Sequence, residues 1–325
     1  MGSSAILSPA FATAFLARAG AGARLSFAQF MDLALYHPKL GYYRRDAARV
    51  GYGAGTDFYT ASTSGTVFGE MVAAACTTLL DGAKPADYTF VEIGAEPGGG
   101  ILTGVTHPFG AARTVRVGEP VAITGPCVVF SNELFDAQPL RRFVGREGGW
   151  RELGVELHGD ALREVELAPA TEPWLPSEAP EGYVFDAPRA AADLAATLAA
   201  QPWTGLFVAF DYGKSFAQLA AETPLGTARA YFKHTQSNDL LAQPGEQDLT
   251  GHVCWDWLVD ALTQGGFLKP VVESQESFFI HHAGEFLSRT MAAEANRLSQ
   301  RKLSLMQLLH PSHLGQKFQV LHARR

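Results

Sequence analysis

Charged residues and cysteines are both scarce in this chain of 325 residues. Charged side chains make up 18% of it, and its three cysteines, Cys76, Cys127 and Cys254, lie too far apart to form a metal-ligand pattern. No stretch of about 18 consecutive apolar residues is present, so we expect no membrane span. The formal net charge of -7 argues against a broad nucleic-acid-binding surface, and we expect no nucleic-acid partner.

The N-terminus and the histidines support two further exclusions. An apolar stretch runs from Ile6 to Leu16, but no basic residue precedes it, which is unlike a secretory signal. Scattered cysteines suit a reducing compartment, so the sequence predicts a cytoplasmic protein. His281 and His282 are the only adjacent histidines. Because neighbouring residues rarely share a metal ion, we predict no metal site.

Short apolar segments alternate with helical ones along the chain. Residues 89–94, 127–130 and 205–213 have the composition of buried strands and end in or next to polar residues. Such strands, alternating with helices, predict a mostly parallel sheet covered on both faces, which is an α/β fold. The polar–apolar alternation of residues 141–167 predicts antiparallel strands inserted beside this sheet.

The remaining segments complete the predicted architecture. Residues 1–85 indicate a helical and irregular N-terminal extension with a glycine-rich loop, part of the same unit as the domain formed by residues 86–325. Asp186, with Pro188 just after it, is expected to start an alanine-rich helix. The amphipathic pattern of residues 285–309 predicts one long C-terminal helix.

Residues 128–139 are the most informative segment for function. A short β-branched and aromatic run ends abruptly in Asn132, Glu133 and Asp136. In open α/β sheets, ligands bind just beyond the carboxyl ends of the strands, so these three side chains are candidates for chemistry. The alternative is structural, since Asn132 or Asp136 can also cap a helix or turn.

Two glycine-rich segments are candidates for cofactor binding. Glu92, Gly94, Ala95 and Gly98 lie at the end of the first predicted strand and in the turn that follows it, where glycine lets the backbone approach a nucleotide. Glycines also serve ordinary tight turns. The loop at 53–60, which contains Asp57 and Phe58, can fold over a ligand, or it is a surface loop with a hydrophobic anchor.

Taken together, the motifs resemble those of the MidA-like (DUF185) family of S-adenosylmethionine-dependent methyltransferases. The matching pieces, spread over nearly the whole chain, are residues 27–43, 57–61, 67–70, 91–95, 132–137, 211–213 and 244–250, with a looser echo at 314–319. The resemblance implies a Rossmann-like methyltransferase sheet. It also implies methyl transfer to a protein, with arginine as the acceptor for mitochondrial members, which assist the assembly of respiratory complex I.

The resemblance assigns roles to the candidate residues. S-adenosylmethionine would bind at Asp57, Phe58, Glu92, Gly94, Ala95 and Gly98, and Glu119 either holds its ribose or lies in a turn. Asn132, Glu133 and Asp136 would form the catalytic site. Glu133 and Asp136 could orient an acceptor guanidinium through paired charge-assisted hydrogen bonds.

The sequence departs from the family pattern around the cofactor turn. Glu96 and Pro97 occupy the turn where the family has a glycine pattern, and residues 94–128 are too few for a full methyltransferase core. A second hypothesis is therefore a catalytically degenerate relative that acts as an assembly or interaction protein without the cofactor. A small-molecule methyltransferase is a third.

Overall fold

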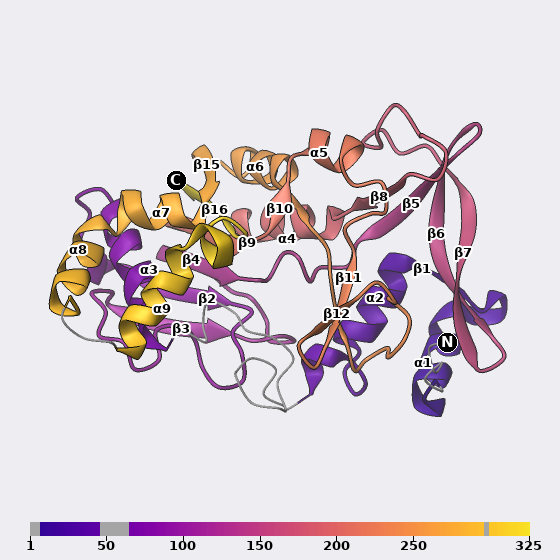
Figure 1. The fold of residues 1–325 in the computed structure, drawn as a ribbon, viewed down its shortest axis with the longest axis horizontal. Coiled ribbons are helices and arrows are strands. Elements are labelled where there is room, and N and C mark those ends of the chain that lie inside the picture. The colour runs from indigo at the N-terminus through magenta and orange to yellow at the C-terminus, as the bar shows by residue number, and fades with distance from the viewer. Residues whose placement is uncertain (1–6, 46–64, 296–298) are drawn as a thin grey trace. The chain divides into compact units, whose positions relative to one another are not determined.

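The computed structural model describes residues 7–45, 65–295 and 299–325, which form two compact units (Figure 1). Unit 1 consists of residues 1–46, 135–194 and 213–257, and unit 2 of residues 47–134, 195–212 and 258–325. The glycine-rich loop with Asp57 and Phe58 lies outside the described residues. No helix among the described residues is long and apolar enough to cross a membrane.

Unit 2 is built on a six-stranded sheet with the order β15-β16-β9-β4-β2-β3. Its strands are β2 (Thr89–Ile93), β3 (Ala111–Val115), β4 (Gly125–Asn132), β9 (Trp203–Asp211), β15 (Leu268–Ser274) and β16 (Gln319–Arg324). The strands β3, β2, β4 and β9 are parallel, whereas β16 is antiparallel to both of its neighbours. The predicted parallel pairing of the three apolar segments is confirmed.

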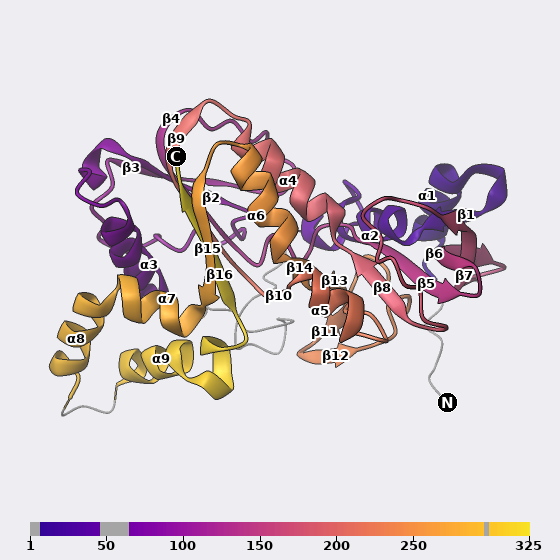
Figure 2. The same cartoon turned by 90° about the horizontal axis from the view of Figure 1, so that it is seen from above.

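Helices α3, α7 and α9 pack on one face of this sheet, as Figure 2 shows. The helices of this unit are α3 (Thr66–Leu79), α7 (Gln275–His282), α8 (Gly284–Ala293) and α9 (Gln300–Leu309). Fully buried phenylalanines fill the layer between sheet and helices, and ring centroids of Phe68 and Phe210 lie 5.4 Å apart. Phenylalanine rings therefore form much of the contact between the sheet and these helices.

The prediction of one long helix over residues 285–309 is wrong, because this segment contains two helices. It is divided into α8, which ends at Ala293, and α9, which begins at Gln300. Ser299 precedes α9 as its N-cap and accepts a hydrogen bond from the backbone N–H of Lys302. Both helices contribute to the core of unit 2, with Leu287 of α8 and Leu305 and Leu308 of α9 buried there.

Unit 1 contains a five-stranded antiparallel sheet in which β6 is paired with β1, β5 and β7, and β5 with β8. Its helices and strands are α1 (Pro9–Ala19), β1 (Arg24–Ser26), α2 (Phe27–Tyr36), β5 (Arg141–Arg146), β6 (Gly149–His158), β7 (Ala161–Ala170), β8 (Val184–Ala187), β10 (Gly213–Lys214), α5 (Phe216–Ala221), β11 (Arg229–Phe232), β12 (Thr235–Ser237), β13 (Asp248–Thr250) and β14 (Val253–Cys254). The predicted antiparallel insert at 141–167 is confirmed as β5, β6 and β7. Two further helices, α4 (Arg189–Ala199) and α6 (Trp255–Gln264), span unit boundaries in the sequence.

The predicted alanine-rich helix forms as α4, but it begins at Arg189 and not at Asp186, which lies in strand β8 and is buried. Its carboxylate accepts hydrogen bonds from the Arg142 side chain at 2.9 Å and from the backbone N–H groups of Thr227 and Ala228 at 2.5 and 2.8 Å. A buried charge is tolerated only when it is paired and hydrogen-bonded, and these contacts meet that condition.

We predict that Asp186→Ala destabilises the chain by about 3–5 kcal/mol, because it leaves a buried guanidinium and two backbone donors without this acceptor. The measurement is the free energy of unfolding in urea. Arg146→Ala, on the same strand as Arg142, removes only ion pairs to the half-exposed Glu166 and the exposed Glu181 and should destabilise the chain much less than Asp186→Ala. Equal losses of unfolding free energy in the two variants would contradict the role of Asp186 as the buried acceptor for Arg142.

Candidate functional site

The carboxyl ends of β2, β4 and β9 lie at one edge of the sheet in unit 2. Glu92 of β2 is opposite Phe130 of β4, and Asn132 of β4 is opposite Phe210 of β9. Asp211 is the last residue of β9. Because parallel strands in register end at the same edge, Glu92, Asn132 and Asp211 are grouped at this edge of the sheet.

Glu92 is a buried acid that holds the turn after β2. Its carboxylate accepts a hydrogen bond from the backbone N–H of Ile101 at 2.7 Å. Burial raises the pKa of Glu92 from 4.5 to about 7, although this hydrogen bond acts in the opposite direction. Glu92 therefore stabilises the turn through Ile101, in addition to its predicted role in cofactor binding.

The turn that begins at Gly94 is fastened to the neighbouring strand β3. The backbone N–H groups of Gly94 and Ala95 both donate to the carbonyl oxygen of Val115, at 2.8 and 3.3 Å. Gly94 has φ +82°, and a Cβ there would lie 2.9 Å from Leu134 Cδ1, so glycine is required at this position. The backbone N–H groups of these two predicted cofactor-binding residues are thus engaged within the fold.

No helix connects β2 to β3, since residues 94–110, all of which are described, form only turns and irregular backbone. The glycines and prolines of this segment disfavour a helix. A helix N-terminus, which commonly binds anionic groups after the first strand of such sheets, is therefore missing at this position.

Glu119 is exposed and lies in a tight turn shortly after β3. Its carboxylate accepts a hydrogen bond from the backbone N–H of Arg116 at 2.8 Å, and the Arg116 guanidinium donates to the carbonyl oxygen of Pro97 at 2.8 Å. Arg116 thus links the two turns at this edge. Gly98 is exposed as well, and no heavy atom lies within 4 Å of the position that a Cβ would take there.

The end of β4 presents Asn132 and Glu133 together. The Asn132 side-chain amide donates to Glu133 Oε1 at 3.0 Å, and the Glu133 backbone N–H donates to the carbonyl oxygen of Phe210 at 2.9 Å. Glu133 has φ +52°, a left-handed conformation that is uncommon for a side chain of this kind. Strained conformations of this kind are concentrated at functional sites.

Asp136, the third predicted catalytic residue, belongs to unit 1 and is buried there. In that unit the Tyr43 hydroxyl donates to Asp248 Oδ1 at 2.8 Å, and the ring of Tyr36 stacks on that of Tyr43 with centroids 5.6 Å apart. Burial raises the pKa of both tyrosines, and the charges of Asp248 and Asp136 add to the rise.

Sequence reasoning did not single out Tyr36, Tyr43 and Asp248 as a cluster, although all three lie within the matching motifs. Tyr43 and Asp248 are 205 residues apart in the sequence, so no spacing rule connects them. The available signal was that the two motifs are rich in aromatic and acidic residues. The structure shows the hydrogen bond between Tyr43 and Asp248.

The strand order and the single antiparallel strand β16 define a class I methyltransferase fold. A COG1565 superfamily member from Burkholderia thailandensis, solved bound to S-adenosyl-homocysteine, is similar with a TM-score of 0.86 and 24% identity over 99% of this chain and 95% of that chain. A native structure of a COG1565 superfamily protein from the same organism has a TM-score of 0.81, with 22% identity and the same coverage of each chain.

The sequence comparisons agree with the fold. The family model described as "Putative S-adenosyl-L-methionine-dependent methyltransferase" matches residues 114–271. The mitochondrial protein arginine methyltransferase NDUFAF7 of Danio rerio is 24% identical, covering 91% of this chain and 82% of the relative, and that of Xenopus laevis is 23% identical, covering 92% and 82%. These matches agree with the resemblance to the MidA-like family of S-adenosylmethionine-dependent methyltransferases that the motifs indicated.

We predict that Glu92→Gln flattens the dependence of stability on pH. With a pKa of about 7 when folded, against 4.5 ordinarily, Glu92 binds its proton more tightly in the folded chain. The contribution of Glu92 to the free energy of unfolding therefore falls as the pH rises from about 4.5 to about 7. Removing this titration should reduce the difference between about pH 5 and about pH 8 by about 2–3 kcal/mol.

Urea unfolding at the two pH values provides the measurement for Glu92→Gln. Glu285→Gln is the matched control, because the Glu285 side chain is 89% exposed. An unchanged pH dependence in Glu92→Gln would show that the carboxyl is not held in a desolvated state.

We also predict that Gly100→Ala destabilises the turn by about 1–3 kcal/mol, because a Cβ there would collide with Glu92 Oε2 and lie 2.7 Å from Thr114 Cγ2. Gly98→Ala is the control and should be close to neutral, since the space beside it is open. Denaturant midpoints of the two variants measure the difference. Similar midpoints would show that Glu92 does not pack against Gly100.

Proposed function

We propose that this chain transfers a methyl group from S-adenosylmethionine to a protein side chain, and that the acceptor is an arginine. The observation that carries the proposal is the Asn132–Glu133 pair at the carboxyl end of β4, where Glu133 has an uncommon backbone conformation. The relatives named above as protein arginine methyltransferases support the choice of acceptor. The cytoplasmic location stays a prediction.

The residues at the sheet edge fit the cofactor in two respects. Glu119 offers an exposed carboxylate beyond β3, which is suited to accept hydrogen bonds from ribose hydroxyls, and Gly98 offers open space for close approach. When bound, the cofactor supplies an electrophilic methyl group on a sulfonium. The backbone of Gly94 and Ala95 contributes the shape of the turn, because their N–H groups are bonded to Val115.

Glu133 would act on the acceptor by position and charge. A carboxylate binds a guanidinium through charge-assisted hydrogen bonds, and it fixes the direction in which the acceptor nitrogen points. Asn132 restrains the Glu133 carboxylate by donating to one of its oxygens at 3.0 Å. Holding the acceptor nitrogen in line with the methyl group supplies much of the rate in reactions of this type.

A second candidate function has one specific observation in its favour. The turn after β2 contains Glu96 and Pro97, has two of its donors engaged with Val115, and is not followed by a helix. A relative that lost cofactor binding and acts as an assembly partner would tolerate these changes. The two functions differ in whether the chain binds S-adenosyl-homocysteine.

We expect calorimetry to show saturable binding of S-adenosyl-homocysteine, with a dissociation constant on the order of micromolar. With an arginine-containing protein substrate and labelled S-adenosylmethionine, Glu133→Gln and Asp136→Asn should lower methyl transfer at least about tenfold while leaving cofactor binding within about twofold. Both changes keep the shape of the side chain and remove its charge.

The control for this experiment is Glu166→Gln, which alters a carboxylate in strand β7 that pairs with Arg146. Full transfer by both site variants would exclude the carboxylate grip on the acceptor. Absence of S-adenosyl-homocysteine binding by a chain with a cooperative unfolding transition would overturn the proposed enzyme and favour the assembly partner.

A further inference from the structure

Glu273 and three histidines meet on the helix-covered face of the sheet in unit 2. Glu273 lies near the end of β15, and His281 and His282 are the last residues of α7, the helix that follows β15 directly. His322 comes from the adjacent strand β16, where it is opposite Val271. The cluster therefore joins two strands and a helix.

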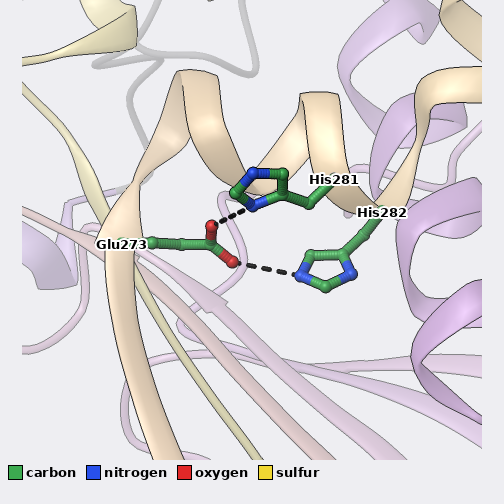
Figure 3. Close-up of side chains that lie close together, drawn as sticks. All are labelled: Glu273, His281 and His282. Carbon is green, nitrogen blue, oxygen red and sulfur yellow. Dashed lines mark hydrogen bonds and ion pairs between the residues drawn. The ribbon is translucent and has the colours of Figure 1, made fainter.

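All three histidine rings contact the Glu273 carboxylate. His281 Nδ1 lies 2.7 Å from Oε2, and the Nε2 atoms of His282 and His322 each lie 3.1 Å from Oε1. Figure 3 shows His281 and His282 pointing toward the same carboxylate from the end of α7. The candidate ligand atoms of Glu273, His281 and His282 are all within 4.8 Å of one another.

The two adjacent histidines reach one point because they use different ring nitrogens. Neighbouring side chains on a helix diverge by about 100°, which is why the sequence argued against a shared metal. His281 uses Nδ1, the nitrogen nearer to the backbone, and His282 uses Nε2, the farther one. The difference in reach compensates for the divergence in direction.

The cluster is also largely shielded from solvent, except on the side of His281. The side chains of Glu273, His282 and His322 are 14%, 21% and 10% exposed, whereas that of His281 is 61% exposed. A cation would thus be enclosed by three side chains and reached from solvent past His281.

We propose that Glu273, His281 and His282 bind a single Zn²⁺ ion. Two imidazole nitrogens and one carboxylate form a common ligand set for Zn²⁺, with metal–nitrogen distances of about 2.0–2.1 Å. His322 is a positioning residue, because its contact with Oε1 of Glu273 orients the carboxylate, as second-layer partners of metal ligands do. The ion would link the C-terminal end of α7 to the end of β15.

The test is titration of the chelator-treated full chain with Zn²⁺ by calorimetry. We expect one ion per chain, and affinity at least about tenfold lower in His281→Ala and in Glu273→Gln. His313→Ala is the matched control: His310 and His313 form another close histidine pair, with ring centroids 5.3 Å apart, outside the group of ligand atoms described above. The affinity of His313→Ala for Zn²⁺ should match that of the unaltered chain.

A second readout separates metal binding from a purely structural role. Zn²⁺ should raise the unfolding midpoint of the unaltered chain and of His313→Ala, but not that of His281→Ala, whose exposed side chain can be removed without disturbing the core. Absence of saturable Zn²⁺ binding, or equal affinity in all variants, would overturn the proposal and leave the cluster as an ion-pair network. S-adenosyl-homocysteine binding is measured separately, so failure of one proposal does not decide the other.

Discussion

The parallel register of β2, β4 and β9 is the constraint on which the candidate site in unit 2 depends. It places Glu92, Phe130 and Val208 side by side across three strands. Because side chains alternate between the faces of a sheet, this register directs the phenylalanines to α3 and α7 and brings the polar strand ends to one edge. A shift of one residue in any of these strands would turn Phe90, Phe130 or Phe210 to the opposite face of the sheet, away from the aromatic layer.

The aromatic layer also explains how a short connection between β2 and β3 is tolerated. Phe90 packs against Phe109, with ring centroids 5.3 Å apart, and against Phe130, at 5.5 Å. Phe109 belongs to the helix-free connection itself, so that segment is anchored by a buried ring rather than by a helix. The Ile101 hydrogen bond to Glu92 provides a second anchor for the same segment.

The sequence predicted β2, β4 and β9 of unit 2 and the antiparallel insert of unit 1 because both rest on local apolar patterns. It failed at Asp186, where a proline nearby suggested a helix start, because the partners that bury this acid are more than 40 residues away along the chain. The sequence argued against a metal site at His281 and His282 because adjacent residues rarely share an ion, and it did not show that the two rings reach Glu273 through different nitrogens. Local pattern determines elements, whereas sites with distant partners require the fold.

The glycine-rich turn after β2 differs from the nucleotide-binding turns on which its predicted role was based. Gly94 and Ala95 donate to Val115, so backbone donors that could bind a ligand are used to fix the turn. Glu119 and Gly98 stay predicted cofactor contacts, and the space beside Gly98 is open. Fixing the turn in advance has a compensating benefit, because a preorganised site loses less conformational entropy when a ligand binds.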